Sequence, residues 1–294
     1  MHQHISAVLA AANRKKMTFE VIRHILWYIV YVAVAVVLLF PVAFMITKSL
    51  MTGTEAASLP MRFWPENPTF ENYKLMFTEN NYLRYACNTL IIVVFNMIAI
   101  PFAASVVAYG FAKTKFAGKN VLFVAMLSTI MLPSMVVQIP QFAMFSAFGW
   151  INTYYPMTIP NLFGGGAMNV FLLRQFMRGI PNELDNAAKI DGANAFQRYL
   201  LITLPLCVPI LIYVMITVFN TYWSDFFGPL MYLKTESKYT LAIGIFRDSI
   251  QNSSVQKVPV RMAAGVFMTI LPAILFFVFQ KQLIEGVTVG SIKG

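Results

Sequence analysis

Long apolar runs alternate with short polar segments along most of this chain. A helix needs about 20 apolar residues to cross a bilayer, and the fourth run is interrupted by NLFGGG, from Asn161 to Gly166. Several runs contain proline, so we expect kinked helices around a cavity. The pattern predicts an all-α, polytopic membrane protein with six transmembrane helices, over residues 25–46, 86–112, 121–147, 157–173, 206–222 and 262–280.

The composition agrees with a membrane protein. Of the 294 residues, 58% are hydrophobic and only 12% are charged, whereas soluble chains have about 25% charged residues. Lys and Arg outnumber Asp and Glu by 22 to 12. In a membrane protein this excess marks cytoplasmic loops, so we expect membrane lipid and no nucleic acid as a partner. Cys87 and Cys207 have no metal or disulfide spacing and are interpreted as core residues.

Basic residues favour a cytoplasmic N-terminus. Arg14, Lys15 and Lys16 precede the first span, and no A-x-A cleavage site follows it, which indicates an uncleaved anchor. The loop KTKFAGKN, residues 113–120, has three lysines and no acid and is expected on the same side. The predicted organisation is a cytoplasmic N-terminal segment (1–24), a six-helix domain (25–284) and a cytoplasmic tail (285–294).

Two long segments are predicted on the external side. Residues 47–85 are rich in Pro, Asn and aromatic residues, which suggests an ordered cap lying on the membrane. Residues 223–261 contain the polar stretch DSIQNSSVQK, which is interpreted as a protruding loop.

A charged, amphipathic stretch, PNELDNAAKIDGANAFQRYLLITLP, separates spans four and five over residues 181–205. We expect two short helices joined at Gly192, which permits a left-handed stop. Asn182 is expected to cap the first helix, with Glu183 and Asp185 in its first turn. Asn194, followed by Gln197, is expected to cap the second helix.

This hairpin is either an element resting on lipid headgroups or a protein-docking element. Lipid-binding helices usually combine basic residues with bulky apolar ones. Here acids lie beside the small residues Ala187 and Ala188, which let another protein surface approach closely. The second interpretation is favoured.

NAAKIDGANAFQRYLLITLP resembles the EAA loop of binding-protein-dependent ABC importer permeases. The matching positions are Ala187, Ala188, Asp191, Gly192, Ala193, Ile202, Leu204 and Pro205, while Asn186 replaces the glutamate of the motif. In that family the loop is a cytoplasmic coupling helix in a cleft of the ATPase subunit. The resemblance implies that the coupling residues are Asp185, Asn186, Ala187, Ala188, Asp191, Gly192 and Ala193.

The stretch from Ser237 to Phe246 and the tail EGVTVGSIKG resemble the maltose-type carbohydrate permeases. This resemblance implies a type I importer fold in the bacterial cytoplasmic (inner) membrane and a sugar substrate. The implied partners are a second homologous permease, two ATPase subunits and an extracytoplasmic solute-binding protein. Lys293 and Gly294 are then expected to contact the ATPases.

The sequence shows no enzyme chemistry. It has no G-x-x-x-x-G-K-[ST] loop, no nucleophile–base set and no metal-ligand spacing. No cofactor of its own is therefore expected, and ATP and Mg would be bound by the partner ATPases. A secondary transporter, a channel or a scaffold subunit is the alternative, although the predicted spans lack the Asp and Glu that ion-coupled carriers usually need.

Polar and aromatic residues within or beside the spans are candidates for a substrate path. Interhelical hydrogen bonding or anchoring at the membrane interface is the competing interpretation for each of them. The candidates are Asn96, Gln138, Asn161, Asn169, Asn220, Tyr222, Trp223 and Asp225.

Overall fold

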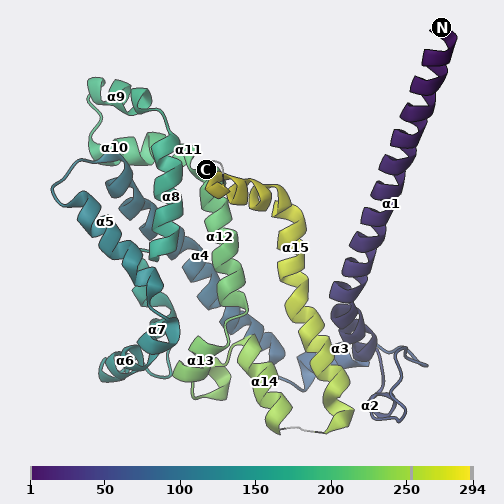
Figure 1. The fold of residues 1–294 in the computed structure, drawn as a ribbon. Helices are drawn as coiled ribbons and strands as arrows, with labels where there is room; N and C mark the ends of the chain where they lie inside the picture. Colours follow the sequence, from purple (N-terminus) through teal and green to yellow (C-terminus); the bar gives the residue numbers. More distant parts are fainter. Residues whose placement is uncertain (1, 252–253, 292–294) are drawn as a thin grey trace. The chain divides into compact units, whose positions relative to one another are not determined.

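The computed structural model describes residues 2–251 and 254–291, with side chains described for 20–251 and 254–283. These residues form helices and turns and contain no β-strand (Figure 1), which confirms the all-α prediction. The chain divides into two compact units. The first comprises Met1–Tyr73 and Ser254–Val266, and the second comprises Lys74–Ser253 and Phe267–Gly294.

The first unit is built on one long helix. α1 runs without interruption over His2–Ser49, so the predicted N-terminal segment and first span form a single helix. The apolar side chains between Val21 and Phe40 are exposed in this chain. An apolar helix without a protein cover is typical of a segment that faces lipid or another subunit. The unit also contains α2 (Gly53–Ala56), the start of α3 (Glu71–Thr78), η5 (Val255–Lys257) and the first residues of α15 (Val258–Ser291).

Hydrogen bonds order the segment after α1, as predicted for the cap. The Asn72 side chain donates to the carbonyls of Ser49 and Met51 at 2.8 and 2.7 Å. The Glu55 carboxylate accepts from the backbone N–H groups of Thr52 and Asn67. These bonds hold the pKa of Glu55 below its usual value, and the bond from Thr52 has the largest effect. The location of this segment at a membrane surface stays a prediction.

The second unit contains the remaining helices. Their bounds are α4 (Tyr82–Lys113), α5 (Lys119–Ser128), η1 (Thr129–Met131), α6 (Ser134–Ala147), α7 (Tyr155–Thr158), η2 (Ile159–Leu162), α8 (Ala167–Gly179), α9 (Asn182–Ile190), α10 (Ala195–Arg198), the π-helical turn η3 (Tyr199–Thr203), α11 (Leu204–Leu206), α12 (Val208–Trp223), α13 (Phe227–Tyr232), η4 (Glu236–Lys238) and α14 (Leu241–Gln251). The rest of α15 also belongs here and bends at Phe279, whose φ is −112° and ψ is 16°.

The core of this unit lies where α8 and α12 pack against α4. α4 contributes Ala104 and Ala108, both completely buried. Small residues let helix backbones approach closely, which is the usual way in which membrane helices pack. Larger side chains from the other two helices fill the space: Val170, Leu173 and Met177 from α8, and Ile210, Val214 and Val218 from α12.

Among the described residues, three helices are long and apolar enough to cross a membrane, over Glu20–Ser49, Tyr82–Lys113 and Val255–Leu283. Two bent pairs raise the number to as many as five: Lys119–Met131 with Ser134–Ala147, bent by 99°, and Ala195–Leu206 with Val208–Trp223, bent by 76°. The first bend lies at Pro133, where a helix cannot continue its hydrogen bonds. The six-span count stays a prediction.

The predicted fourth span, residues 157–173, is not one continuous helix. α7 and η2 end at Leu162, and three glycines precede α8. Gly164, Gly165 and Gly166 have φ angles of 98°, 65° and 86°, a region that only glycine adopts readily. A Cβ at Gly165 would lie 2.4 Å from the Ile100 carbonyl oxygen on α4. The interruption predicted at NLFGGG is therefore confirmed, and the close approach to α4 leaves no room for a side chain at Gly165.

Two other predictions need correction. The stretch DSIQNSSVQK is not all loop, because residues 248–251 belong to α14, residues 255–257 form η5, and residues 252–253 lie outside the described residues. α14 packs closely enough on α4 that a Cβ at Gly244 would collide with the Tyr85 ring. Cys207 is buried as predicted, whereas Cys87 is exposed and is not a core residue.

The glycine turn gives a test of this packing. Gly165→Ala should lower the thermal stability of the detergent-solubilised protein more than Gly149→Ala does. Gly149 has a similar φ of 70° but open space around it, so its replacement carries only the backbone cost, about 1–2 kcal/mol. Gly165→Ala adds a collision with α4. Equal losses of stability, measured as the temperature at which monodisperse protein disappears, would contradict the close approach.

Candidate functional site

The hairpin formed by α9, α10 and their connection has the two-helix form predicted for it. α9 ends at Ile190, and Gly192 follows with a φ of 86°, as expected for a left-handed stop. Asn194 then caps α10, because its side chain accepts from the Gln197 N–H while the Gln197 side chain accepts from the Asn194 N–H, both at 2.9 Å. Both predictions are confirmed.

The predicted capping role of Asn182 is wrong. Pro181 occupies the capping position, and Asn182 is the first residue of α9. The Asn182 side-chain oxygen instead accepts from the Lys113 ammonium at 3.0 Å, and Lys113 also donates to the Ile180 carbonyl at 2.8 Å. The last residue of α4 therefore holds the start of the hairpin.

Two further contacts fix the hairpin. Arg198 Nε lies 3.2 Å from Asp185 Oδ1, which joins α10 to α9, and these side chains are only 16% and 20% exposed. The hydroxyl groups of Tyr199 and Ser105 lie 2.7 Å apart, which joins η3 to α4. Tyr199 is buried and packs against Tyr109. Asp185, predicted as a contact for another protein, is thus engaged within the chain.

The other predicted coupling residues differ in exposure. Asn186, Ala187, Asp191 and Gly192 are exposed, while Ala188 and Ala193 are half-buried. Large apolar side chains lie among them: Leu184 is 46% exposed, Ile190 87% and Phe196 67%. Ile190 was not among the predicted residues, although an isoleucine between the charged residues Lys189 and Asp191 is a recognisable signal. These exposed apolar groups are available for contact with another protein.

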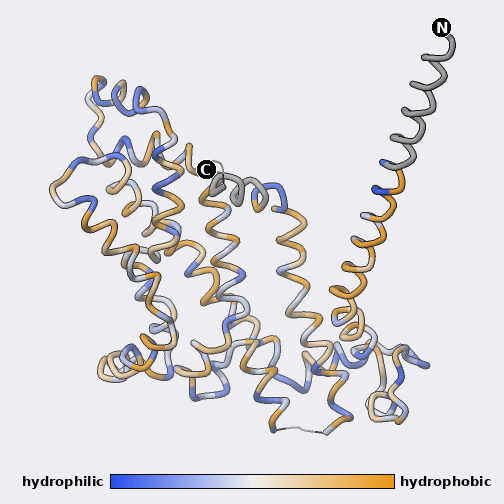
Figure 2. Tube along the Cα trace, viewed as in Figure 1, coloured by the Kyte–Doolittle hydropathy of each residue, from blue (hydrophilic) through white to orange (hydrophobic). Residues whose placement is uncertain are grey.

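The hairpin lies at one end of the second unit, and α13 and α14 lie at the opposite end (Figure 1). Hydrophilic residues gather at both ends, with apolar helices between them (Figure 2). The lysine-rich loop 113–120 begins at the same end as the hairpin, because Lys113 contacts both Ile180 and Asn182. The two segments predicted to share one side of a membrane therefore lie together.

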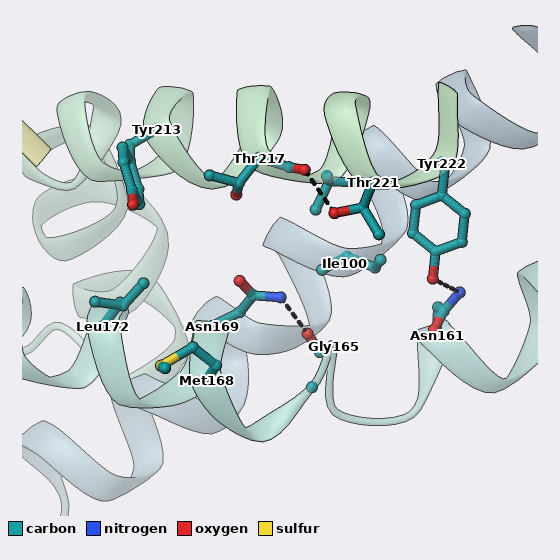
Figure 3. A pocket seen from close by; sticks show the side chains of 12 residues that line it. Ile100, Asn161, Gly165, Met168, Asn169, Leu172, Tyr213, Thr217, Thr221 and Tyr222 are labelled. Carbon is teal, nitrogen blue, oxygen red and sulfur yellow. Dashed lines mark hydrogen bonds between the residues drawn. The ribbon is translucent and has the colours of Figure 1, made fainter. Parts of the chain in front are cut away.

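A pocket of about 320 Å³ lies between the glycine turn, α8 and α12 (Figure 3). It contains three of the candidate path residues, Asn161, Asn169 and Tyr222. Asn161 Nδ2 donates to the Tyr222 hydroxyl at 2.7 Å and to Asn96 Oδ1 at 2.8 Å. The remaining lining residues are Ile100, Gly165, Gly166, Met168, Leu172, Tyr213, Thr217, Val218 and Thr221.

The other candidate residues do not line this pocket. Asn96 is completely buried and donates to the Ile92 and Met157 carbonyls, both at 2.9 Å. Trp223 is buried and donates to the Met268 carbonyl at 2.8 Å. Gln138, on α6, and Asn220 are absent from the lining. Asn96 and Trp223 therefore join helices, which is the competing interpretation given to them above.

Asp225 lies just beyond α12 and orders the start of α13. Its carboxylate accepts from the Gly228 N–H at 3.2 Å. Burial raises the pKa of Asp225 above its usual value, and the N–H groups of Gly228 and Phe227 partly offset this effect. This carboxylate does not line the pocket.

Sequence reasoning missed Tyr213, Thr217 and Thr221. These residues are spaced four apart on α12 and so lie on one face of the helix, and all three line the pocket (Figure 3). That spacing is visible in the sequence. The spacing was not taken as a signal because threonine is common in membrane helices, where its hydroxyl bonds to the backbone of its own helix.

Curated proteins similar to this chain over most of its length are permeases. A putative ABC transporter permease protein, ORF2, of Caldicellulosiruptor sp. (strain Rt8B.4) is 31% identical over 270 residues, which cover 91% of this chain and 97% of that protein. The maltodextrin transport system permease protein MdxG of Bacillus subtilis (strain 168) is 28% identical over 281 residues, covering 94% of this chain and 99% of that protein.

A solved structure shares the fold. It is a chain from the crystal structure of a bacterial ABC transporter involved in the import of the acidic polysaccharide alginate. The TM-score is 0.77 at 22% sequence identity, and the match covers 88% of this chain and 96% of that one. The sequence profile of the binding-protein-dependent transport system inner membrane component family matches residues 100–289, more than half of the chain. With these residues matched, the chain belongs to the family of inner membrane components of binding-protein-dependent transport systems, the permease subunits of ABC importers.

Proposed function

We propose that this chain is one of two permease subunits of an ATP-driven importer for a saccharide, to which an extracytoplasmic solute-binding protein delivers the substrate. Family membership supports the permease role, and relatives named for maltodextrin transport support the saccharide. The mechanism is inferred mainly from the hairpin. It exposes apolar side chains, and hydrogen bonds of Lys113 and Tyr199 link it to α4.

The exposed hairpin is proposed to dock on one of two partner ATPase subunits, which bind ATP and Mg. Ile190 and Leu184 provide apolar contact, while the small residues Ala187 and Ala188 permit a close approach. Closure of the ATPase pair on ATP would displace the hairpin, and its bonds to α4 would carry the displacement into the core. ATP then drives the change by its different affinity for the two states of the ATPase pair.

Six spans in the bacterial inner membrane, with both termini in the cytoplasm, complete the proposal. They consist of α1, α4, the bent pair α5–α6, the broken segment from α7 to α8, α12, and α15. The segment 1–24 and the tail 285–294 are proposed to be cytoplasmic. Apolar surfaces that this chain leaves exposed are proposed to face lipid or the second permease. Family membership disfavours a secondary transporter or a channel.

Cysteine labelling tests this topology. In a background where the exposed Cys87 is replaced by Ser, Asn120→Cys should be protected from a membrane-impermeant thiol reagent in intact cells. Ser249→Cys should react, because it lies on α14 at the opposite end of the second unit (Figure 1). Both positions are exposed in the chain, so folding alone protects neither. The reverse labelling pattern would contradict the proposed orientation.

The docking role can be tested at Ile190. Replacing it with Asp should reduce co-purification of the ATPase subunits while leaving the amount of permease in the membrane unchanged. Burial of an isoleucine contributes about 1.5–3 kcal/mol, which corresponds to a loss of affinity of roughly tenfold or more. Phe227→Asp is the matched control, since Phe227 is 57% exposed on α13 at the other end of the unit. If both variants retained the ATPases equally, the hairpin would not be the docking element.

The C-terminal tail is proposed to contact the ATPase pair through Lys293 and Gly294, which lie outside the described residues. The resemblance to carbohydrate permeases supports this proposal. Deleting residues 291–294 should leave membrane insertion intact but change the basal and the saccharide-stimulated ATPase rates by different factors, because a contact made in one state biases switching. Unchanged values of both rates in the assembled complex would exclude such a contact.

A further inference from the structure

The pocket between the glycine turn, α8 and α12 is polar but carries no charge. Its polar side chains are amides and hydroxyl groups, and none of the lining residues is Asp, Glu, Lys, Arg or His. Transfer of an ionised group into such surroundings, without an opposite charge, costs far more than transfer of a neutral polar group. The pocket therefore favours an uncharged ligand over an acidic one.

The hydrogen bonds within the pocket leave acceptor atoms facing its interior. Asn169 Nδ2 donates to the Gly165 carbonyl at 2.8 Å, which leaves the amide oxygen as an acceptor (Figure 3). The hydroxyl groups of Thr217 and Thr221 donate to the carbonyls of Val214 and Thr217, at 2.8 and 2.9 Å. Their oxygen lone pairs are then available to accept from a ligand. A ligand rich in O–H donors complements this arrangement.

The pocket also contains one hydroxyl group that can donate. The Tyr222 oxygen accepts from Asn161 Nδ2 at 2.7 Å, so its own hydrogen can point to a ligand. Asn161 is held in turn by Asn96, which is buried. This chain of bonds fixes the Tyr222 side chain before a ligand arrives, which reduces the entropy lost on binding.

The remaining walls are apolar. Ile100, Met168 and Leu172 line the pocket together with the ring of Tyr213. Sugars combine hydroxyl groups with C–H faces, so they match a lining that contains both acceptors and apolar surface. The volume of about 320 Å³ is near the lower end of the range for small-molecule sites, about 300–1,000 Å³. It suits a short segment of a saccharide rather than a long chain.

We propose that this pocket is a saccharide contact site within this chain, and that it selects an uncharged sugar segment through acceptors from Asn169, Thr217 and Thr221. The inference rests on the proposed role in saccharide import and adds the substrate class and the residues. The fold neighbour is described as importing an acidic polysaccharide. This pocket has no basic group to pair with a uronate.

Sugar binding measured on the permease complex alone is distinguished from sugar binding to the solute-binding protein. The complete complex with its partner permease and ATPases is placed in lipid nanodiscs without binding protein. Saturation-transfer NMR is then recorded with maltotriose, galactotriose and arabinotriose as neutral probes, and with trigalacturonate as the acidic probe. At least one neutral trisaccharide should show transfer, and trigalacturonate none. Transfer to trigalacturonate as strong as to the neutral sugars, or to none of the four, would overturn the inference.

The double variant Thr217→Val, Thr221→Val removes two acceptors at constant shape. It should weaken neutral-sugar binding by about tenfold, with membrane content and ATPase co-purification unchanged. The control is Thr129→Val, because the Thr129 hydroxyl also bonds to its own helix, at 2.6 Å from the Met126 carbonyl, but does not line the pocket. Binding by the double variant equal to that of the control would refute the assignment of these residues.

Uptake by whole cells separates a failure of the pocket assignment from a failure of the proposed function. Cells that carry the wild-type complex and its binding protein should import at least one neutral saccharide in an ATP-dependent manner. Failure of the wild type to import any saccharide contradicts the proposed function itself. Uptake by the wild type with an equal maximal rate in the double variant contradicts only the pocket. Because the external binding protein captures the sugar, the double variant should lower the maximal rate and leave the half-saturating concentration unchanged.

Discussion

The close packing of α8 and α12 on α4 is the contact on which the second unit depends. Ala104 and Ala108 leave room for the side chains of the facing helices, and at Gly165 even a methyl group would collide with α4. In a bilayer, lipid tails are as apolar as leucine, so burial alone contributes little to helix association. Close van der Waals contact and hydrogen bonds such as Asn161 to Asn96 must stabilise the arrangement.

α4 connects the hairpin proposed for docking with the pocket proposed for saccharide contact. At one end it holds the hairpin through Lys113 and through Ser105, which contacts Tyr199. In its middle it contributes Ile100 to the pocket and carries Asn96, which holds Asn161. A displacement of the hairpin would reach the pocket through α4, in which Pro101 lacks the N–H for one backbone hydrogen bond. The proposed function requires such a physical link between the partner ATPases and the pocket.

Much of the fold and part of the candidate site followed from local sequence. The left-handed stop at Gly192 and the cap at Asn194 depend on residues within one or two turns, so both were correct. The cap at Asn182 failed because Lys113, 69 residues away, takes its side chain. The long apolar helices were recognisable by composition. The predicted fourth span is broken by three glycines with positive φ, and the packing of Gly165 against α4 could not be read from the sequence.

The sequence by itself determined the helical membrane class, the family and the position of the hairpin, because periodicity, composition and a local motif carry that information. Only the tertiary structure decided which polar groups join helices and which face a cavity. Asn96 and Asn161 are both asparagines in apolar surroundings, separated by 65 residues, yet one is completely buried and the other lines the pocket. The difference lies in which helices surround each side chain, and that depends on contacts between segments far apart in the chain.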